Sequence, residues 1–274
     1  MRLRSLLFVP GDRPDRFVKA AASGADALIL DLEDSVVPAR KAEARAAVAA
    51  YLNGERTLPL FVRVNPLDSG LIDDDLTATL SGSPDGLMLP KAEGAVSIAA
   101  LAAKAPGVPI LPVATETPAA MFQLGSYAQA AGHLAGLTWG AEDLPAAIGA
   151  STAREADGSY TAPYQLARSL TLFGAHAAGV PAIETVYPDF RDEAGLAAYA
   201  ARGRRDGFAG MMAIHPAQVQ VINAAFTPSD EELAHARRVV ALFAADPDAG
   251  ALQLDGRMVD APHLKAARRL LASV

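Results

Sequence analysis

Acidic side chains follow short apolar runs at several points of this sequence. In "ILPVATETPAAM", residues 110–121, a run typical of a buried strand leads to Glu116, and Pro118 then opens a helical pattern. Carboxylates that converge on one cavity repel each other and raise each other's pKa values unless a cation lies among them. The sequence has no cysteine and little histidine at such positions, so the ligands would be oxygens, which favours Mg²⁺ or Mn²⁺ over zinc.

Other apolar runs also end in polar residues. They are Asp31, Glu33 and Asp34, then Arg63 and Asn65, Lys91 and Glu93, Glu142 and Asp143, Tyr187 and Asp189, and His215. One acid of the Glu142–Asp143 pair is the expected second metal ligand beside Glu116, because the two acidic sites follow successive apolar runs. The alternative is that each acid merely stabilises the N-terminus of the helix that follows it.

Two groups of basic residues suit an anionic substrate. Arg63 ends the apolar run "FVRVN", where its planar guanidinium suits bidentate binding of a carboxylate or, alternatively, a structural salt bridge to a neighbouring acid. The stretch "PGDRPDRFVK" predicts a turn that opens a helix carrying Arg16 and Lys19. A helix N-terminus with basic side chains attracts phosphate, although both residues could equally belong to a solvated helix face.

The elements that must position these side chains alternate along the chain. Short apolar runs predict strands, and alanine-rich segments with helical spacing lie between them. The predicted strands are 4–10, 27–33, 60–65, 86–91, 110–116, 136–141, 182–187 and 210–216. Eight βα units favour an α/β fold, a (β/α)8 TIM barrel over residues 1–228, with an open doubly wound sheet as the alternative. Residues 229–274 exceed what barrel closure needs and predict a C-terminal helical extension.

Composition narrows the function classes. The 274 residues are 51% hydrophobic and 20% charged, which is typical of a globular protein. A net charge of -7 argues against nucleic acid or an anionic membrane as the main partner. No run is long enough to be a membrane span or a signal sequence, so we expect a cytoplasmic enzyme.

Seven motifs occur together and in order: "RSLLFVPGDRPDRFVKA", "DALILDLEDSV", "FVRVNPLDSG", "LMLPKAE", "TETPAAM", "WGAEDLPAAIG" and "AIHPAQV". In combination they resemble the citrate lyase beta subunit-like group of the HpcH/HpaI aldolase family, whose relatives include malyl-CoA and citramalyl-CoA lyases. The resemblance implies a (β/α)8 barrel, a divalent metal (usually Mg²⁺), and reversible carbon–carbon cleavage or formation between a 2-oxo acid and an acyl thioester.

The same resemblance implies roles for the candidate residues of the barrel. Glu116 and Asp143 would bind the metal, and Glu116 would also contact the substrate. Arg63 would hold the carboxylate of the 2-oxo acid. Glu33 and Asp34 correspond to residues that hold metal-bound waters in relatives.

Outside that cluster, the resemblance assigns a thioester site and an acid/base. Arg16 and Lys19 lie where relatives bind the phosphates of coenzyme A. The tail "DGRMVDAPHLKAARRL" resembles a segment that packs over a neighbouring subunit and supplies an aspartate acid/base, which here is Asp260. This implies a homotrimer or a hexamer. The alternative role for Asp260 is the N-cap of a helix that begins at Pro262.

Three rival functions differ from a stand-alone thioester lyase. An aldolase acting on free acids would carry a histidine after the second strand, and "DLEDSVVPARKAEAR" has none. A thioesterase acting on malyl-CoA would use nearly the same site. A subunit that depends on a lyase alpha subunit or an acyl-carrier protein would also keep these residues. The sequence names neither the acyl group nor the 2-oxo acid.

Overall fold

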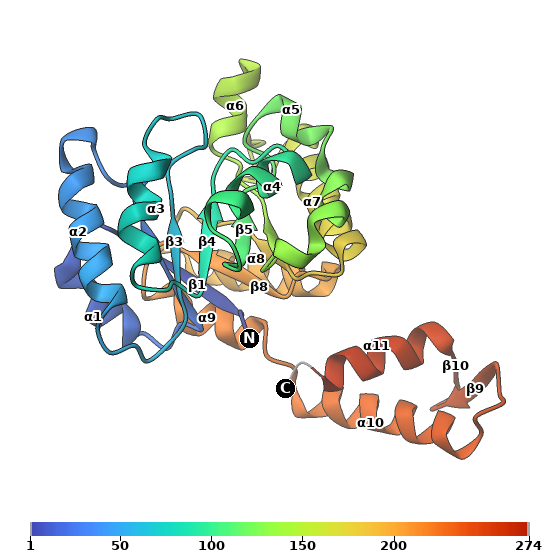
Figure 1. Ribbon diagram of the computed structural model, residues 1–274. Helices are drawn as coiled ribbons and strands as arrows, with labels where there is room; N and C mark the ends of the chain where they lie inside the picture. Colours follow the sequence, from blue (N-terminus) through green and yellow to red (C-terminus); the bar gives the residue numbers. More distant parts are fainter. Residues whose placement is uncertain (1, 273–274) are drawn as a thin grey trace. The chain divides into compact units, whose positions relative to one another are not determined.

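The computed structural model describes residues 2–272, which divide into two compact units (Figure 1). One unit spans Leu3–Phe226, and the other comprises residues 227–272 together with Arg2. Each unit has hydrophobic core residues of its own. No helix in the described part of the chain has both the length and the apolar character that a membrane span requires.

The Leu3–Phe226 unit is built on eight parallel strands. They are β1 (Ser5–Pro10), β2 (Ala27–Asp31), β3 (Leu60–Arg63), β4 (Gly86–Leu89), β5 (Ile110–Pro112), β6 (Leu137–Thr138), β7 (Ala182–Glu184) and β8 (Gly210–Ala213). Hydrogen bonding follows the order β5-β4-β3-β2-β1-β8-β7-β6, so the first strand pairs with the last. A parallel bridge between Val113 and Thr138 links the two remaining edges. The predicted (β/α)8 barrel is therefore confirmed, and the doubly wound alternative is excluded.

Helices surround these strands (Figure 1), because parallel strands must be covered on the face that points away from the barrel interior. They are α1 (Pro14–Ala21), η1 (Pro38–Arg40), α2 (Lys41–Leu52), α3 (Ile72–Leu80), α4 (Ala95–Lys104), α5 (Pro118–Met121), η2 (Leu124–His133), α6 (Asp143–Ile148), α7 (Ala162–Ala178), α8 (Glu193–Asp206) and α9 (Gln218–Ala225). Gly179 ends α7 with a φ of 71°, a conformation that glycine adopts without a Cβ clash.

Alternation along each strand decides which side chains enter the barrel. Ile29 of β2 and Phe61 of β3 belong to the inner hydrophobic cluster, whereas Leu30 packs outward against the helices. Two residues further on, the same alternation points Asp31 and Arg63 inward at the C-terminal ends of their strands. The register of β2 and β3 pairs Asp31 with Arg63, so the two charges meet side by side at the mouth of the barrel.

The unit that follows residue 226 contains α10 (Asp230–Ala245), β9 (Ala251–Leu254), β10 (Arg257–Asp260) and α11 (Ala261–Leu271). The two helices agree with the predicted helical extension. The hairpin of β9 and β10 was not predicted. Its signal was present in the Asp255–Gly256 pair, whose φ angles of 51° and 77° suit a two-residue hairpin turn.

Candidate active site

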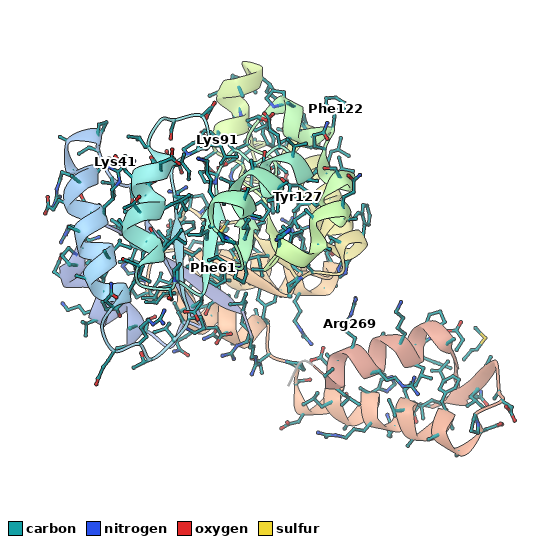
Figure 2. All side chains as sticks on the ribbon, viewed as in Figure 1. Lys41, Phe61, Lys91, Phe122, Tyr127 and Arg269 are labelled. Carbon is teal, nitrogen blue, oxygen red and sulfur yellow. The ribbon has the colours of Figure 1, made fainter. Side chains whose placement is uncertain are left out.

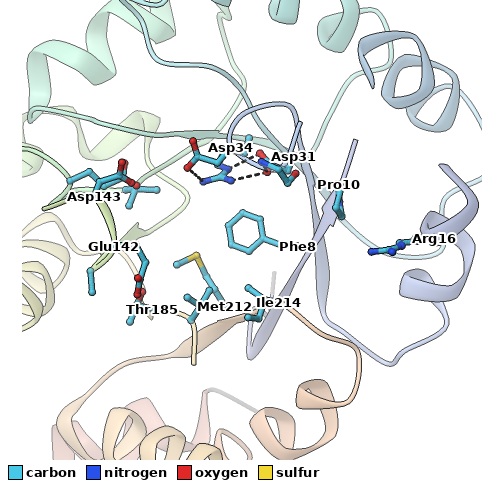
Figure 3. A pocket seen from close by; sticks show the side chains of 17 residues that line it. Phe8, Pro10, Arg16, Asp31, Asp34, Glu142, Asp143, Thr185, Met212 and Ile214 are labelled. Atoms are coloured by element: carbon cyan, nitrogen blue, oxygen red, sulfur yellow. Dashed lines mark hydrogen bonds and ion pairs between the residues drawn. The ribbon is translucent and has the colours of Figure 1, made fainter. Parts of the chain in front are cut away.

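A cavity of about 320 Å³ opens at the C-terminal ends of the strands (Figure 3). It is lined by Phe8, Pro10, Arg16, Asp31, Asp34, Ser35, Arg63, Val113, Glu116, Gly140, Ala141, Glu142, Asp143, Thr185, Val186, Met212 and Ile214. Asp31, Asp34 and Asp143 lie along one side of the cavity, and the apolar Met212 and Ile214 lie on the opposite side (Figure 3). The cavity therefore brings together an acidic wall, in which Arg63 stands among the carboxylates, and an apolar wall.

Arg63 and Asp31 form a bidentate ion pair at this mouth. The Arg63 Nε and Nη2 atoms donate to the two Asp31 carboxylate oxygens, each at 2.7 Å. The Asp31 carboxylate also accepts the main-chain N–H groups of Glu33 at 2.9 Å and Ser35 at 3.0 Å. Burial raises the pKa of Asp31, but the hydrogen bonds and charge of Arg63 outweigh burial, so the pKa lies below its ordinary value.

Arg63 also contacts the acids of the loop after β2. Its Nη1 atom lies 2.9 Å from Glu33 Oε2 and 3.6 Å from Asp34 Oδ2. The guanidinium carbon stands 5.0 Å from the centre of the Phe8 ring. The sequence left open whether Arg63 pairs with neighbouring acids or faces a substrate. The structure shows the pairing, and it also places Arg63 among the residues that line the cavity.

Glu116, in the loop after β5, is also buried, with 6% of its surface exposed. Its Oε2 atom accepts the main-chain N–H of Lys91 at 2.6 Å. Burial raises the pKa of Glu116 to about 8, with further contributions from the Asp143 and Glu33 charges, while the Lys91 N–H opposes the shift. Without a metal, this environment therefore favours the protonated form of the carboxyl group.

Lys91 connects three of the candidate acids. Its Nζ atom donates to Glu33 Oε1 at 3.0 Å and lies 3.4 Å from Asp143 Oδ1, and its main chain holds Glu116. Burial lowers the pKa of Lys91, but Glu33 and the other nearby acids raise it well above the ordinary value. The sequence placed Lys91 at a strand end but gave it no role. Its φ of 50°, rare for a residue with a side chain, belongs to the turn that brings its N–H to Glu116.

The donor set fits a hard divalent cation. Glu116 and Asp143 both line the cavity, and burial, together with the Asp143 and Glu33 charges, raises the pKa of Glu116, an effect that a bound cation would offset. Among residues 2–272, no group of three or more Asp, Glu, His or Cys side chains is arranged as a complete metal site. Mg²⁺ binds through one or two carboxylates plus water and substrate oxygens, so two protein ligands are sufficient.

Of the two predicted phosphate-binding residues, only one lines the cavity. Arg16 lines the cavity from α1, whereas Lys19 lies exposed in the last turn of that helix and does not line it. Arg13, at the N-cap of α1, pairs with Asp15 at 2.9 Å. Only Arg16 is therefore brought to the cavity.

Asp260 belongs to the C-terminal unit, where it is the N-cap of α11. Its Oδ1 atom lies 2.5 Å from His263 Nδ1, in a capping box. The hydrogen bond from His263 lowers the pKa of Asp260. The capping role is therefore observed, and the acid/base role stays a prediction.

Glu184 is a buried acid that the sequence gave no reason to single out. It ends β7 with none of its surface exposed, and its carboxylate accepts from Trp139 Nε1 at 2.6 Å and Arg168 Nε at 2.7 Å. Trp139 is fully buried in the core. These bonds fix the ends of β6 and β7 next to Thr185, which lines the cavity.

His215 stacks on Phe190 with ring centres 4.6 Å apart.

The chain is similar to known proteins over most of its length. Residues 4–216 match the family model described as HpcH/HpaI aldolase/citrate lyase. The chain is 41% identical over 266 residues to a citrate lyase subunit beta-like protein of Mycobacterium tuberculosis, covering 97% of this chain and 93% of the relative. It is 34% identical over 275 residues to a (3S)-malyl-CoA thioesterase of Cereibacter sphaeroides, covering 98% and 93%.

A solved structure has the same fold over the full length. The crystal structure of CitE from Mycobacterium tuberculosis in complex with magnesium, acetoacetate and coenzyme A superposes with a TM-score of 0.85 at 38% identity, covering 99% of this chain and 98% of that chain. The resemblance seen in the sequence motifs and the predicted enzyme class, a carbon–carbon lyase, are confirmed. The chain belongs to the HpcH/HpaI aldolase/citrate lyase family.

Proposed function

We propose that this protein is a Mg²⁺-dependent lyase that cleaves or forms a 3-hydroxyacyl thioester of the malyl-, citramalyl- or citryl-CoA type. The products of cleavage are a 2-oxo acid and an acyl thioester. One observation carries the proposal: Arg63 and the Glu116–Asp143 pair line one cavity, in a chain 38% identical to a protein whose structure holds magnesium, acetoacetate and coenzyme A.

Glu116 and Asp143 hold the metal in this proposal, with Mn²⁺ as an alternative to Mg²⁺. Glu33 and Asp34 would hold waters bound to the ion. When bound, the ion supplies Lewis-acid chemistry at the oxygens of the 2-oxo acid. Glu116 would hold the ion in its carboxylate form, so it would have to lose the proton that burial favours on this group.

Arg63 binds the carboxylate of the 2-oxo acid and fixes its orientation. Asp31 holds two of the guanidinium nitrogen atoms, which leaves Nη1 as the nitrogen shared with Glu33 and Asp34. A substrate carboxylate competes with these two acids for Arg63. The bidentate pair with Asp31 keeps the guanidinium plane in place during that exchange.

Asp260 is the proposed acid/base. In the condensing direction it removes the proton next to the thioester carbonyl, and in the cleaving direction it returns that proton to the product enolate. We propose that residues 229–274 of a neighbouring subunit bring Asp260 to the cavity, so that the enzyme is a homotrimer or a hexamer. Arg16 and Lys19 bind the phosphates of the coenzyme A thioester.

Two alternatives keep the same residues. A malyl-CoA thioesterase is supported by the relative of that name at 34% identity. Water would then attack the thioester carbonyl and release the coenzyme A thiol, and the carbon–carbon bond would stay intact. A subunit that works with a lyase alpha subunit or an acyl-carrier protein would use the same cavity. The cytoplasmic location expected from the sequence stays a prediction.

Turnover by the purified protein alone tests the proposal. With Mg²⁺, the substrates are malyl-CoA, citramalyl-CoA and citryl-CoA, and the controls are Glu116→Ala and Asp260→Asn. Release of glyoxylate, pyruvate or oxaloacetate, lost in both variants, would support a stand-alone lyase. Release of free coenzyme A with an intact hydroxy acid would favour the thioesterase. Inactivity on every thioester, with Mg²⁺ and a 2-oxo acid still bound, would favour the carrier-dependent subunit.

A further inference from the structure

A buried lysine lies behind the acidic wall, on the side away from the cavity. Lys41 begins α2 and has 9% of its surface exposed (Figure 2). Its Nζ atom donates to the main-chain oxygens of Leu32 at 2.6 Å and Glu33 at 2.9 Å, and to Asn65 Oδ1 at 2.8 Å. These bonds use all three N–H groups of the ammonium. None of the three acceptors is a charged group. Lys41 therefore binds two main-chain carbonyls and a side-chain amide and does not pair with an acid.

The segment that Lys41 binds carries two candidate site residues. Glu33 and Asp34 follow β2 in an irregular loop, in which the Glu33 carbonyl accepts the main-chain N–H of Val36 at 3.0 Å. On the cavity side, the Asp31 carboxylate accepts the N–H groups of Glu33 and Ser35. On the far side, Lys41 donates to the carbonyl of Glu33. The main chain of Glu33 is thus held from both sides.

A polar network fixes Lys41 itself. Asn65 donates from Nδ2 to the Leu32 carbonyl at 3.0 Å and to Asp75 Oδ2 at 2.7 Å. Asp75 is fully buried and accepts from Arg45 Nε at 2.7 Å. Lys41 and Arg45 stand four residues apart on α2, so they share one face of that helix. α2 therefore holds the loop through Lys41 and Arg45, whose charged groups belong to the same hydrogen-bond network.

We propose that Lys41 is a positioning residue, which fixes the main chain of residues 32–34 and so directs Glu33 and Asp34 toward Arg63 and Lys91. The assignment of the loop to a metal and substrate site rests on the proposed function, whereas the anchoring of the loop rests on the hydrogen bonds alone. Groups that orient metal ligands and their neighbours from behind typically change metal affinity by 10- to 100-fold when they are removed.

Lys41→Met tests the inference, because methionine fills a similar volume and donates no hydrogen bond. Hydrogen exchange of the peptide that covers residues 32–36 should accelerate roughly tenfold or more, and Mg²⁺ binding in the presence of pyruvate, measured by calorimetry, should weaken by about 10- to 100-fold. Arg4→Met is the matched control. It breaks the ion pair with Asp26 at 2.7 Å, and it should destabilise the barrel without changing either measurement.

Exchange in residues 32–36 that rises no more in Lys41→Met than in Arg4→Met would overturn the inference. If Lys41→Met does not fold, Asn65→Ala takes its place. That change removes one of the three ammonium acceptors and one donor to the Leu32 carbonyl, and unchanged exchange there would equally overturn the inference. A wild-type protein that binds neither Mg²⁺ nor pyruvate would contradict the proposed function, and the exchange measurement would still decide the role of Lys41.

Discussion

Asp31 and Arg63 are paired residues of neighbouring strands, and their side chains form two hydrogen bonds of 2.7 Å at the mouth of the barrel. Strand register places them side by side, and strand alternation turns both inward. The pair holds the guanidinium plane, and the same carboxylate holds the N–H groups of the loop that carries Glu33. One ion pair therefore organises both the proposed substrate-binding arginine and the acidic loop beside it.

Replacing Asp31 should disturb binding and stability together. Asp31→Asn leaves Arg63 without its main counter-charge at a buried position, which we expect to cost about 3 kcal/mol of unfolding free energy. The misplaced guanidinium should weaken 2-oxo acid binding by up to ~100-fold. Urea denaturation and the KM for the 2-oxo acid measure the two effects.

Asp26→Asn is the control for Asp31→Asn. It removes the partner of Arg4 at the start of β1, away from the cavity. We expect a loss of stability with an unchanged KM. An Asp31→Asn enzyme whose KM also stays unchanged would contradict the orienting role of the pair.

Glu116 should make the stability of the metal-free protein depend on pH. Its folded pKa of about 8 lies above the ordinary 4.5, so the folded protein keeps a proton that the unfolded chain releases. Stability should therefore fall as pH rises from 4.5 to 8, by up to about 1.4 kcal/mol per pH unit, and level off above that range. Urea denaturation in EDTA measures this, and Glu116→Gln should lack the slope. A wild-type profile that matches the variant would refute the buried, protonated state.

The charge of Lys91 should affect the pH at which Glu116 titrates. Its charge lowers the pKa of Glu116, so Lys91→Met should move the midpoint of the stability change to higher pH while the main-chain N–H to Glu116 remains. The measurement is the same denaturation series. Lys104→Met, which breaks an exposed pair with Asp73, should leave the midpoint in place. An unmoved midpoint in Lys91→Met would show that its ammonium does not act on Glu116.

Two substitutions at Asp260 should distinguish its capping role from its proposed chemical role. Asparagine is as good an N-cap as aspartate, so Asp260→Asn should keep the stability of the C-terminal unit while lowering kcat by about 10²- to 10⁴-fold. Asp260→Ala should lower kcat in the same way. It should also lower the free energy of unfolding by about 1 kcal/mol, because alanine cannot cap the helix. Thermal denaturation and kcat measure the two roles.

His263→Ala is the matched change for Asp260. It removes the other half of the capping box and leaves the carboxylate in place. We expect a small loss of stability and a kcat within a few fold of the wild type. Full activity in Asp260→Asn would leave Asp260 with its capping role alone.

The barrel could be predicted from local sequence patterns. Eight apolar runs with helical segments between them predict strands and helices because burial periodicity is local, and the strand ends identify where functional groups must stand. The same reasoning singled out Arg63, Glu116 and the Glu142–Asp143 pair without any contact information, and the family resemblance then favoured Asp143 within the pair. It missed the hairpin of residues 251–260, whose strands are short and mostly solvent-exposed, so they carry little apolar signal beyond the Asp-Gly turn.

The contacts between the site residues could not be predicted from local patterns, because they join distant segments of the chain. Arg63 meets Asp31 across 32 residues of sequence, and Lys91 meets Glu33 across 58. The raised pKa of Glu116 and the anchoring by Lys41 depend on burial and on main-chain groups that no side-chain pattern reports. Local periodicity fixes which face of a strand a residue occupies, whereas register, loop conformation and dielectric environment arise only when the distant segments pack together.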